Sequence, residues 1–294
     1  MSRASVECVL DAKAATGECP VWSAEERVLY WVDIPRGRLN RLDPATARNT
    51  YWVMPGPIGS FAIREQGGFL VAMKNGFHIF DPKTESTKPV ANPEPHMHEN
   101  RLNDGRADRA GRFWCGSMKE PIEPHRPQAT LYRLDSDYHV TPMQSGIITS
   151  NGLAFSPDDK ILYFSDSHPS VRTIWAYDLD IASGEITNRR IFVDTIGLRG
   201  RPDGGTVDAD GCYWMAANDG GCLIRLTPAG KVDMTIDLPI LKPSMPAFGG
   251  KDLDTIFVTS IRPENADLSK QPLAGGVFAV RCGVKGLPEP KFKG

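Results

Sequence analysis

A pattern of short apolar strands recurs six times along this chain of 294 residues. Each copy is a run of aromatic and β-branched residues that follows a polar turn, as VLYWVDI follows SAEER. Successive runs begin 40, 44, 49, 51 and 43 residues apart, at Val28, Gly68, Arg112, Ile161, Cys212 and Thr255. A repeat of this length restricts the chain to a fold assembled from stacked copies of one unit.

Each copy contains candidates for about four strands. An alternating strand follows every VLYW-type run, for example RLNRLDPATA from Arg38, and shorter candidates lie before and after. The sequence therefore predicts an all-β, six-bladed β-propeller with four strands per blade, as a single domain over residues 1–294. A sandwich of two sheets is the alternative.

The two ends of the sequence suggest how the ring closes. The segment SVECVLDA from Ser5 is a strand that belongs to no copy, whereas the last copy lacks a fourth strand after GVFAV. We expect residues 6–11 to pair with residues 277–280, because this pairing would complete the sixth blade and remove an open edge.

Charge and composition exclude several function classes. The 34 Lys and Arg residues nearly balance the 36 Asp and Glu residues, for a net charge of −2, so we expect no nucleic-acid or membrane partner. The chain has no run of eighteen apolar residues and no signal-like start, which predicts a cytoplasmic protein. Its six cysteines form no C-x-x-C pair and are expected to be reduced, and the protein is expected to be a monomer or a weak homo-oligomer.

Polar residues recur at one position of the repeat, nine or ten residues before the VLYW-type runs. Four of the six copies have a carboxylate or carboxamide there, and the six positions are Glu18, Gly59, Asn103, Asn151, Asp203 and the region of Met245 and Pro246. Because loops leading into the innermost strands converge at one mouth of a propeller channel, these oxygens could bind a hard divalent cation. The alternative is that each residue caps its own turn.

The chain resembles the sugar lactonase family that includes SMP-30 (regucalcin) and gluconolactonases. The segments that carry the resemblance are GECPVW, RLNDGRADRAGRFWCGSM, SNGLAFSPDDKILYFSDS, RPDGGTVDADGCYWMA and PLAGGVFAV, in the family's order. The resemblance implies a six-bladed propeller with Glu18, Asn151 and Asp203 as metal ligands. It also implies that Arg101 and Asn103 contact substrate and that Asp203 is the catalytic acid or base.

One segment departs from the family pattern. Many animal members have two consecutive glutamates after their G-T-M segment, and the second one contacts substrate. Here GSMKEP places Glu120 before Pro121. Glu120 remains a candidate substrate contact, and the departure concerns the choice of sugar rather than the metal site.

These features predict a metal-dependent hydrolase that opens the lactone of a sugar acid, such as gluconolactone or a pentonolactone. A bound cation can polarise the ester carbonyl, so the chemistry needs no nucleophilic side chain. The expected cofactor is one divalent cation, calcium first, with Zn, Mn, Mg or Fe as alternatives, since the ligand set does not distinguish them. A phosphotriesterase or arylesterase and a non-enzymatic calcium-binding scaffold remain as alternative functions.

Overall fold

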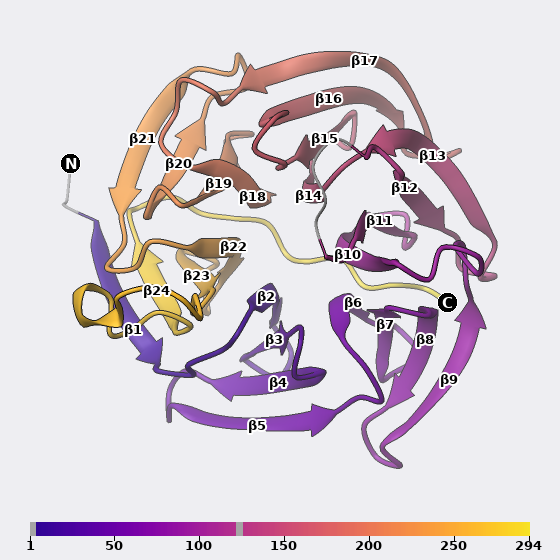
Figure 1. The fold of residues 1–294 in the computed structure, drawn as a ribbon, viewed down its shortest axis with the longest axis horizontal. Helices are drawn as coiled ribbons and strands as arrows, with labels where there is room; N and C mark the ends of the chain where they lie inside the picture. Colours follow the sequence, from indigo (N-terminus) through magenta and orange to yellow (C-terminus); the bar gives the residue numbers. More distant parts are fainter. Residues whose placement is uncertain (1–3, 122–125) are drawn as a thin grey trace.

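The protein folds into six four-stranded antiparallel sheets arranged in a ring, in a computed structural model that describes residues 4–121 and 126–294 (Figure 1). The innermost strands are β2 (Gly17–Ser23), β6 (Ile58–Ile63), β10 (Asn100–Ala107), β14 (Ser150–Phe155), β18 (Arg201–Val207) and β22 (Pro243–Gly249). The second strands are β3 (Val28–Asp33), β7 (Phe69–Met73), β11 (Phe113–Lys119), β15 (Ile161–Asp166), β19 (Tyr213–Asn218) and β23 (Thr255–Ser260).

The outer half of each blade completes the pattern. The third strands are β4 (Arg38–Asp43), β8 (Gly76–Asp81), β12 (Ala129–Leu134), β16 (Thr173–Asp180), β20 (Cys222–Leu226) and β24 (Val277–Arg281). The outermost strands are β5 (Arg48–Val53), β9 (Ser86–Ala91), β13 (Val140–Ile147), β17 (Glu185–Asp194), β21 (Val232–Asp237) and β1 (Ser5–Leu10). The predicted six-bladed propeller is confirmed.

Ring closure uses the predicted pairing of the two ends. Strand β1 pairs antiparallel with β24, with Ser5 opposite Arg281 and Val6 opposite Val280. The sixth blade therefore combines β22, β23 and β24 with a strand from the other end of the sequence.

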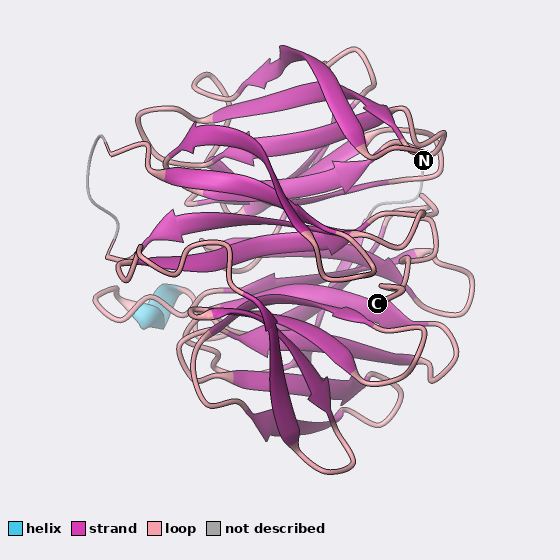
Figure 2. Ribbon diagram, turned by 90° about the vertical axis from the view of Figure 1, so that its right-hand side faces the viewer, coloured by secondary structure: helices cyan, strands magenta, loops and turns pink. Residues whose placement is uncertain are grey.

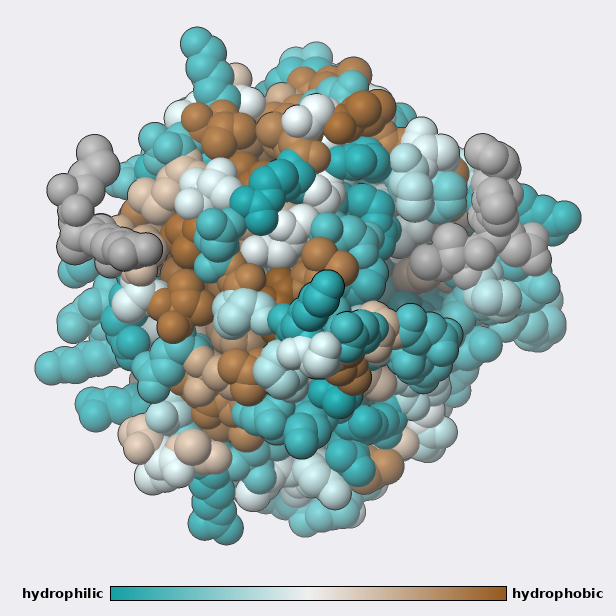
Figure 3. Space-filling model, turned by 60° about the vertical axis from the view of Figure 1, so that its left-hand side comes forward, coloured by the Kyte–Doolittle hydropathy of each residue, from teal (hydrophilic) through white to brown (hydrophobic). Residues whose placement is uncertain are grey.

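Burial explains why inner and outer strands differ in sequence. Every residue of β2, β10 and β14 is buried, because an inner strand has neighbouring blades against both of its faces. The outermost strand β5 has no blade beyond it and contains only exposed and half-buried residues. Figure 3 shows the resulting outer surface, on which hydrophobic patches lie among hydrophilic side chains.

Helices contribute little to the described residues. Among residues 4–121 and 126–294, the one helical element is a short 3-10 helix at Leu268–Lys270 (Figure 2). No helix in this part of the chain has the length and hydrophobicity needed to cross a membrane.

Buried aspartates anchor the turn between the first two strands in two of the blades. Asp208 accepts hydrogen bonds from the backbone of Asp210 and Cys212 on one oxygen, at 3.0 Å each, and from Trp214 Nε1 and Arg225 Nε on the other, at 2.8 Å each. Asp108 binds Trp114 Nε1 in the same way at 2.9 Å. Each carboxylate thus ties its turn to the tryptophan of the neighbouring strand.

All six innermost strands break their pairing register near the same end. The shifts lie between Glu18 and Val21, Ile58 and Ser60, Leu102 and Gly105, Asn151 and Ala154, Pro202 and Gly205, and Pro243 and Pro246. A bulge adds a residue to one strand and redirects the side chains beside it. The repeat therefore carries a backbone irregularity at the positions where the polar residues recur.

Residues 283–294 cross the opposite end of the inner strands as a strap. The backbone N–H of Ala209 donates to Lys285, that of Lys293 donates to Gly111 and that of Phe292 donates to Ile63, at 2.9–3.0 Å. Figure 1 shows this yellow segment running across the middle of the ring. Because Phe292 is fully buried, the strap is part of the packed structure.

Candidate active site

One cavity of about 190 Å³ lies at the ends of the inner strands where the register shifts occur. The residues predicted as metal ligands and substrate contacts line it from four blades, with the exception of Glu120: they are Glu18, Arg101, Asn103, Asn151 and Asp203. The structure brings these five residues together, and their catalytic and ligand roles remain predictions.

Two carboxylates lie in this cavity almost out of contact with water. Glu18 is 9% exposed and Asp203 is 8% exposed. Burial raises the pKa of Asp203 to about 7, and burial followed by repulsion from Asp203 raises the pKa of Glu18 well above its usual value. Two buried carboxylates that disfavour each other's charge are a fitting environment for a divalent cation, which would stabilise both anions.

The carboxamides of the cavity bind one another across blades and do not cap their own turns. Asn103 Nδ2 donates to the carbonyl of Ser150 at 2.7 Å and to Asn151 Oδ1 at 3.0 Å. Asn151 Nδ2 donates to Ser167 Oγ at 2.7 Å. These bonds identify the nitrogen and the oxygen of each amide: the Asn151 nitrogen donates to Ser167, and its oxygen accepts from Asn103.

Arg101 joins Asn103 to Glu120. Its Nη1 donates to Asn103 Oδ1 at 2.5 Å, and its Nε donates to Glu120 Oε1 at 3.1 Å. Arg101 is buried, whereas the Glu120 side chain is 43% exposed. Glu120 does not line the cavity itself, so the ion pair with Arg101 is its structural link to the site.

The sequence analysis missed Asn218, which holds Asp203, and two cationic residues of the same cavity. Asn218, at the end of β19, donates to Asp203 Oδ2 at 2.5 Å, and Arg201 and Lys242 line the same cavity. The sequence did contain a signal for Asn218. It is the last residue of the second strand of its blade, and Asp33 and Asp166 are the last residues of the second strands of two other blades. Comparing the repeats at the ends of the second strands would have identified these positions.

Histidine and cysteine do not supplement the predicted ligands. Within 4–121 and 126–294, no group of three or more His, Cys, Asp and Glu side chains is placed to hold a metal ion. A cation in this cavity would therefore depend on the Asn151 oxygen in addition to Glu18 and Asp203.

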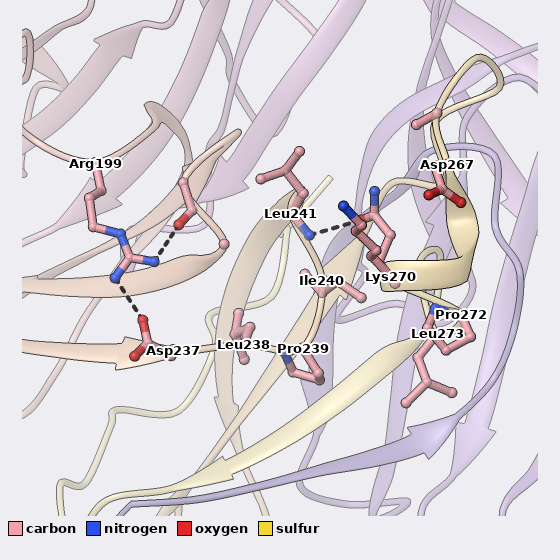
Figure 4. Close-up of a pocket in the computed structure, with 14 residues that line it drawn as sticks. Arg199, Asp237, Leu238, Pro239, Ile240, Leu241, Asp267, Lys270, Pro272 and Leu273 are labelled. Atoms are coloured by element: carbon pink, nitrogen blue, oxygen red, sulfur yellow. Dashed lines mark hydrogen bonds and ion pairs between the residues drawn. The ribbon is translucent and has the colours of Figure 1, made fainter.

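A larger cavity, of about 930 Å³, lies beside the site and lacks these groups. Figure 4 shows Arg199 bound to Asp237 on one side of it, and Leu238, Ile240 and Leu241 along its wall. The Arg199–Asp237 pair is exposed, at 56% and 78% of the two side chains, and is 2.7 Å long. None of the predicted site residues lines this cavity.

Comparison with known proteins places this arrangement in a family. Residues 16–262 match the family model described as the SMP-30/gluconolactonase/LRE-like region. The chain belongs to the SMP-30/gluconolactonase family. It is 41% identical over 292 residues to 6-deoxy-6-sulfogluconolactonase from Pseudomonas putida, with 99% of each chain covered, and 37% identical over 303 residues to human regucalcin, with 100% of each covered.

A solved structure of a regucalcin is also similar to this chain, in both fold and sequence. The crystal structure of a calcium-binding protein, regucalcin, from Agrobacterium tumefaciens is 27% identical and superposes with a TM-score of 0.93, covering 98% of this chain and 97% of the other. As a member of the SMP-30/gluconolactonase family with these relatives, the chain is a hydrolase of the lactonase type.

Proposed function

We propose that this protein hydrolyses the lactone of a sugar acid with the help of one divalent cation. The observation that carries the proposal is the convergence of Glu18, Asn103, Asn151 and Asp203 from four blades on one cavity. The sulfogluconolactonase of Pseudomonas putida, at 41% identity over nearly the whole chain, supports the same reaction class.

Glu18, Asn151 and Asp203 would hold the cation. When bound, it supplies a positive charge that polarises the ester carbonyl and stabilises the oxyanion that develops there. Calcium remains our first choice, since these are oxygen ligands and the Agrobacterium tumefaciens neighbour is described as calcium-binding.

Asp203 is the residue we assign to proton transfer. Its Oδ2 accepts the hydrogen bond from Asn218 Nδ2, which fixes the orientation of the carboxylate. Asp203 takes a proton from the attacking water as the new C–O bond forms, and returns one to the ring oxygen as the ester C–O bond breaks. The products are a free hydroxyl and a carboxylic acid, so the reaction consumes one water and needs no other reactant.

Arg101 and Asn103 orient the sugar. Both side chains are buried and already bound to each other, so little conformational freedom remains for them to lose when substrate binds. Glu120 limits the orientation of Arg101 through its ion pair and could meet a sugar hydroxyl at the cavity edge.

The polar lining disfavours the alternative of a phosphotriesterase or arylesterase. Such substrates would be expected to need an apolar mouth, whereas eight charged or amide side chains line this cavity beside the apolar Ile34, Met118, Ile261 and Pro263. A calcium-binding scaffold without activity has no substrate, so the Arg101–Asn103 pair beside the metal ligands would have nothing to orient.

The test is a pH-indicator assay over a panel of aldonolactones. Protein stripped with a chelator should be inactive, and reloading with single cations should restore turnover and identify the preferred metal. Full activity in the stripped protein, with no cation detected by elemental analysis, would contradict the cation requirement. No turnover of any lactone by the reloaded protein would contradict the proposed reaction.

A further inference from the structure

Two cations at one corner of the candidate active site share a single carboxylate. Arg201 Nε binds Asp219 Oδ2 at 2.9 Å, and Lys242 Nζ binds Asp219 Oδ1. Asp219 is the ion-pair partner of both, and the described residues provide neither cation with a second one. Counting ion pairs alone, this corner of the cavity has one more positive than negative charge, and both cations also act on the nearby carboxylate of Asp203.

The excess charge faces the reacting centre. Arg201 and Lys242 line the same cavity as Asp203, whereas Asp219 is absent from its lining. Arg201 Nη2 and Lys242 Nζ donate to Asn218 Oδ1 at 3.4 and 3.5 Å, and Asn218 Nδ2 donates to Asp203. A single amide thus separates the two cations from the carboxylate assigned to proton transfer.

A second contact links the cations to the other side of the site. Arg201 Nη1 donates to the carbonyl of Ser167 at 3.1 Å, and Ser167 Oγ accepts from Asn151. The guanidinium is therefore held in one place by three residues from two segments, Asn218 and Asp219 at the end of β19 and Ser167 after β15. It is pre-organised for a ligand, which reduces the entropy that binding would cost.

Partial burial makes the charges effective. The side chains of Arg201 and Lys242 are 25% and 24% exposed, against 40% for Asp219. Water screens a charge less at such a site than on an open surface, and hydrogen bonds between charged groups are stronger than those between neutral groups. Neutral hydrogen-bonding groups are enough to bind the hydroxyls of a sugar. Two cations that share one counter-ion suit a ligand with a negative charge.

We propose that Arg201 and Lys242 form an anion subsite that selects lactones carrying a negatively charged group at the terminal carbon of the sugar chain, the end opposite the carbonyl carbon. A sulfonate, a phosphate and a carboxylate share the required chemistry, an anionic oxygen cluster that accepts hydrogen bonds from guanidinium and ammonium groups. This inference rests on the proposed lactonase function and specifies its substrate class.

The test compares kcat/KM for neutral gluconolactone with that for gluconolactone sulfonated or phosphorylated at its terminal carbon, and for glucarolactone, which has a carboxylate there. The wild-type protein should prefer at least one anionic lactone by about tenfold or more, given the strength of hydrogen bonds to charged groups. Added salt should reduce the rate for the anionic lactones much more than for the neutral one.

Variants assign the preference to the two side chains. Lys242→Met and Arg201→Gln should each lower kcat/KM for the preferred anionic lactone by about ten- to a hundredfold, mainly through KM, with a much smaller effect on gluconolactone. Arg201→Lys keeps the charge and should retain part of the preference. Arg199→Gln is the matched control, because Arg199 precedes the same strand but lines the larger cavity, and it should leave all the rates unchanged.

The outcomes separate the two proposals. If gluconolactone is hydrolysed as well as every anionic lactone, the anion subsite is wrong and the lactonase function stands. If no lactone is hydrolysed, the lactonase function is wrong. If Lys242→Met lowers the rates for neutral and anionic lactones equally, the two cations act on Asp203 and not on the substrate, and the anion subsite is wrong. The melting temperatures of all variants show whether any of them has failed to fold.

Discussion

Asp203 shows how much of the site could be predicted from single residues. Its position followed from its offset in the repeat, and the cavity it lines contains the other predicted positions. Its partner Asn218 was missed because it comes from the neighbouring strand, and only the pairing of β18 with β19 brings the two side chains together. The offset of a residue within its repeat predicts where along the channel that residue lies. Which side chains of two strands touch depends on the pairing register of those strands, which the offset does not give.

Substitution of Asp203 should separate proton transfer from substrate placement. Asp203→Ala should lose the cation and reduce kcat by at least about a thousandfold, because it removes both a ligand and the acid/base group. Asn103→Ala should still bind the cation at saturating concentration and lose mainly kcat/KM. Metal content by elemental analysis and steady-state kinetics check both, and substantial turnover by metal-loaded Asp203→Ala would contradict the acid/base assignment.

Removal of the cation should also be visible in stability. Glu18 and Asp203 are buried like charges, so a cation that binds only the folded state should raise the free energy of unfolding by about 2.7 kcal/mol at a concentration a hundred times its Kd. Thermal melts with and without calcium provide the measurement. Glu18→Gln should reduce the calcium-dependent rise in Tm, and an unchanged rise would place the ion elsewhere.

At the scale of the element, the strands were predictable and the bulges were not. Aromatic and β-branched runs with polar turns have a clear sequence signature, so the second strand of each blade was predicted. The register shifts of the inner strands have no shared residue type: one contains Cys19 at φ 46°, another contains Gly152 at φ 66°. Backbone geometry of this kind is set by packing against neighbouring blades and leaves no common pattern in the sequence.

The buried aspartate in the fifth blade should be a strong contributor to stability. Asp208→Ala should lower the free energy of unfolding by about 3 kcal/mol, because it leaves Trp214 Nε1 and two turn amides without their acceptor in the interior, while Arg225 keeps its ion pairs with Asp210 and Asp233. Chemical denaturation measures the change. Asp43→Ala is the comparison, since Asp43 accepts from Ala45 and Thr46 in an exposed turn and its loss should be clearly smaller.

For the whole molecule, sequence repeats predicted the number of blades and the closing strand, but not the strap. Residues 283–294 read as a tail rich in Gly, Pro and Lys without strand periodicity. Their place depends on contacts with four distant segments, including Leu253, Ala209, Gly111 and Ile63. Long-range contacts made by irregular backbone have no local pattern from which they could be predicted.

Deleting residues 4–11 should test ring closure and the single-domain prediction together. Without β1, strand β24 becomes an open edge, so the protein should melt at a lower temperature and associate into larger species. Calorimetry and light scattering measure both effects. Glu7→Ala, which alters only an exposed side chain of β1, should behave as wild type; two separate melting transitions in the wild-type protein would contradict the single domain.

The pairing of β1 with β24 has a consequence for the order in which the protein is made. Five blades, those built on β2, β6, β10, β14 and β18, consist of consecutive strands and can form as each one leaves the ribosome. The sixth blade cannot be completed until Val277–Arg281 has been synthesised, so Ser5–Leu10 must wait through most of translation. During that wait the nascent chain carries an unpaired strand at each boundary of an open ring, and this is the stage at which a chaperone would matter most.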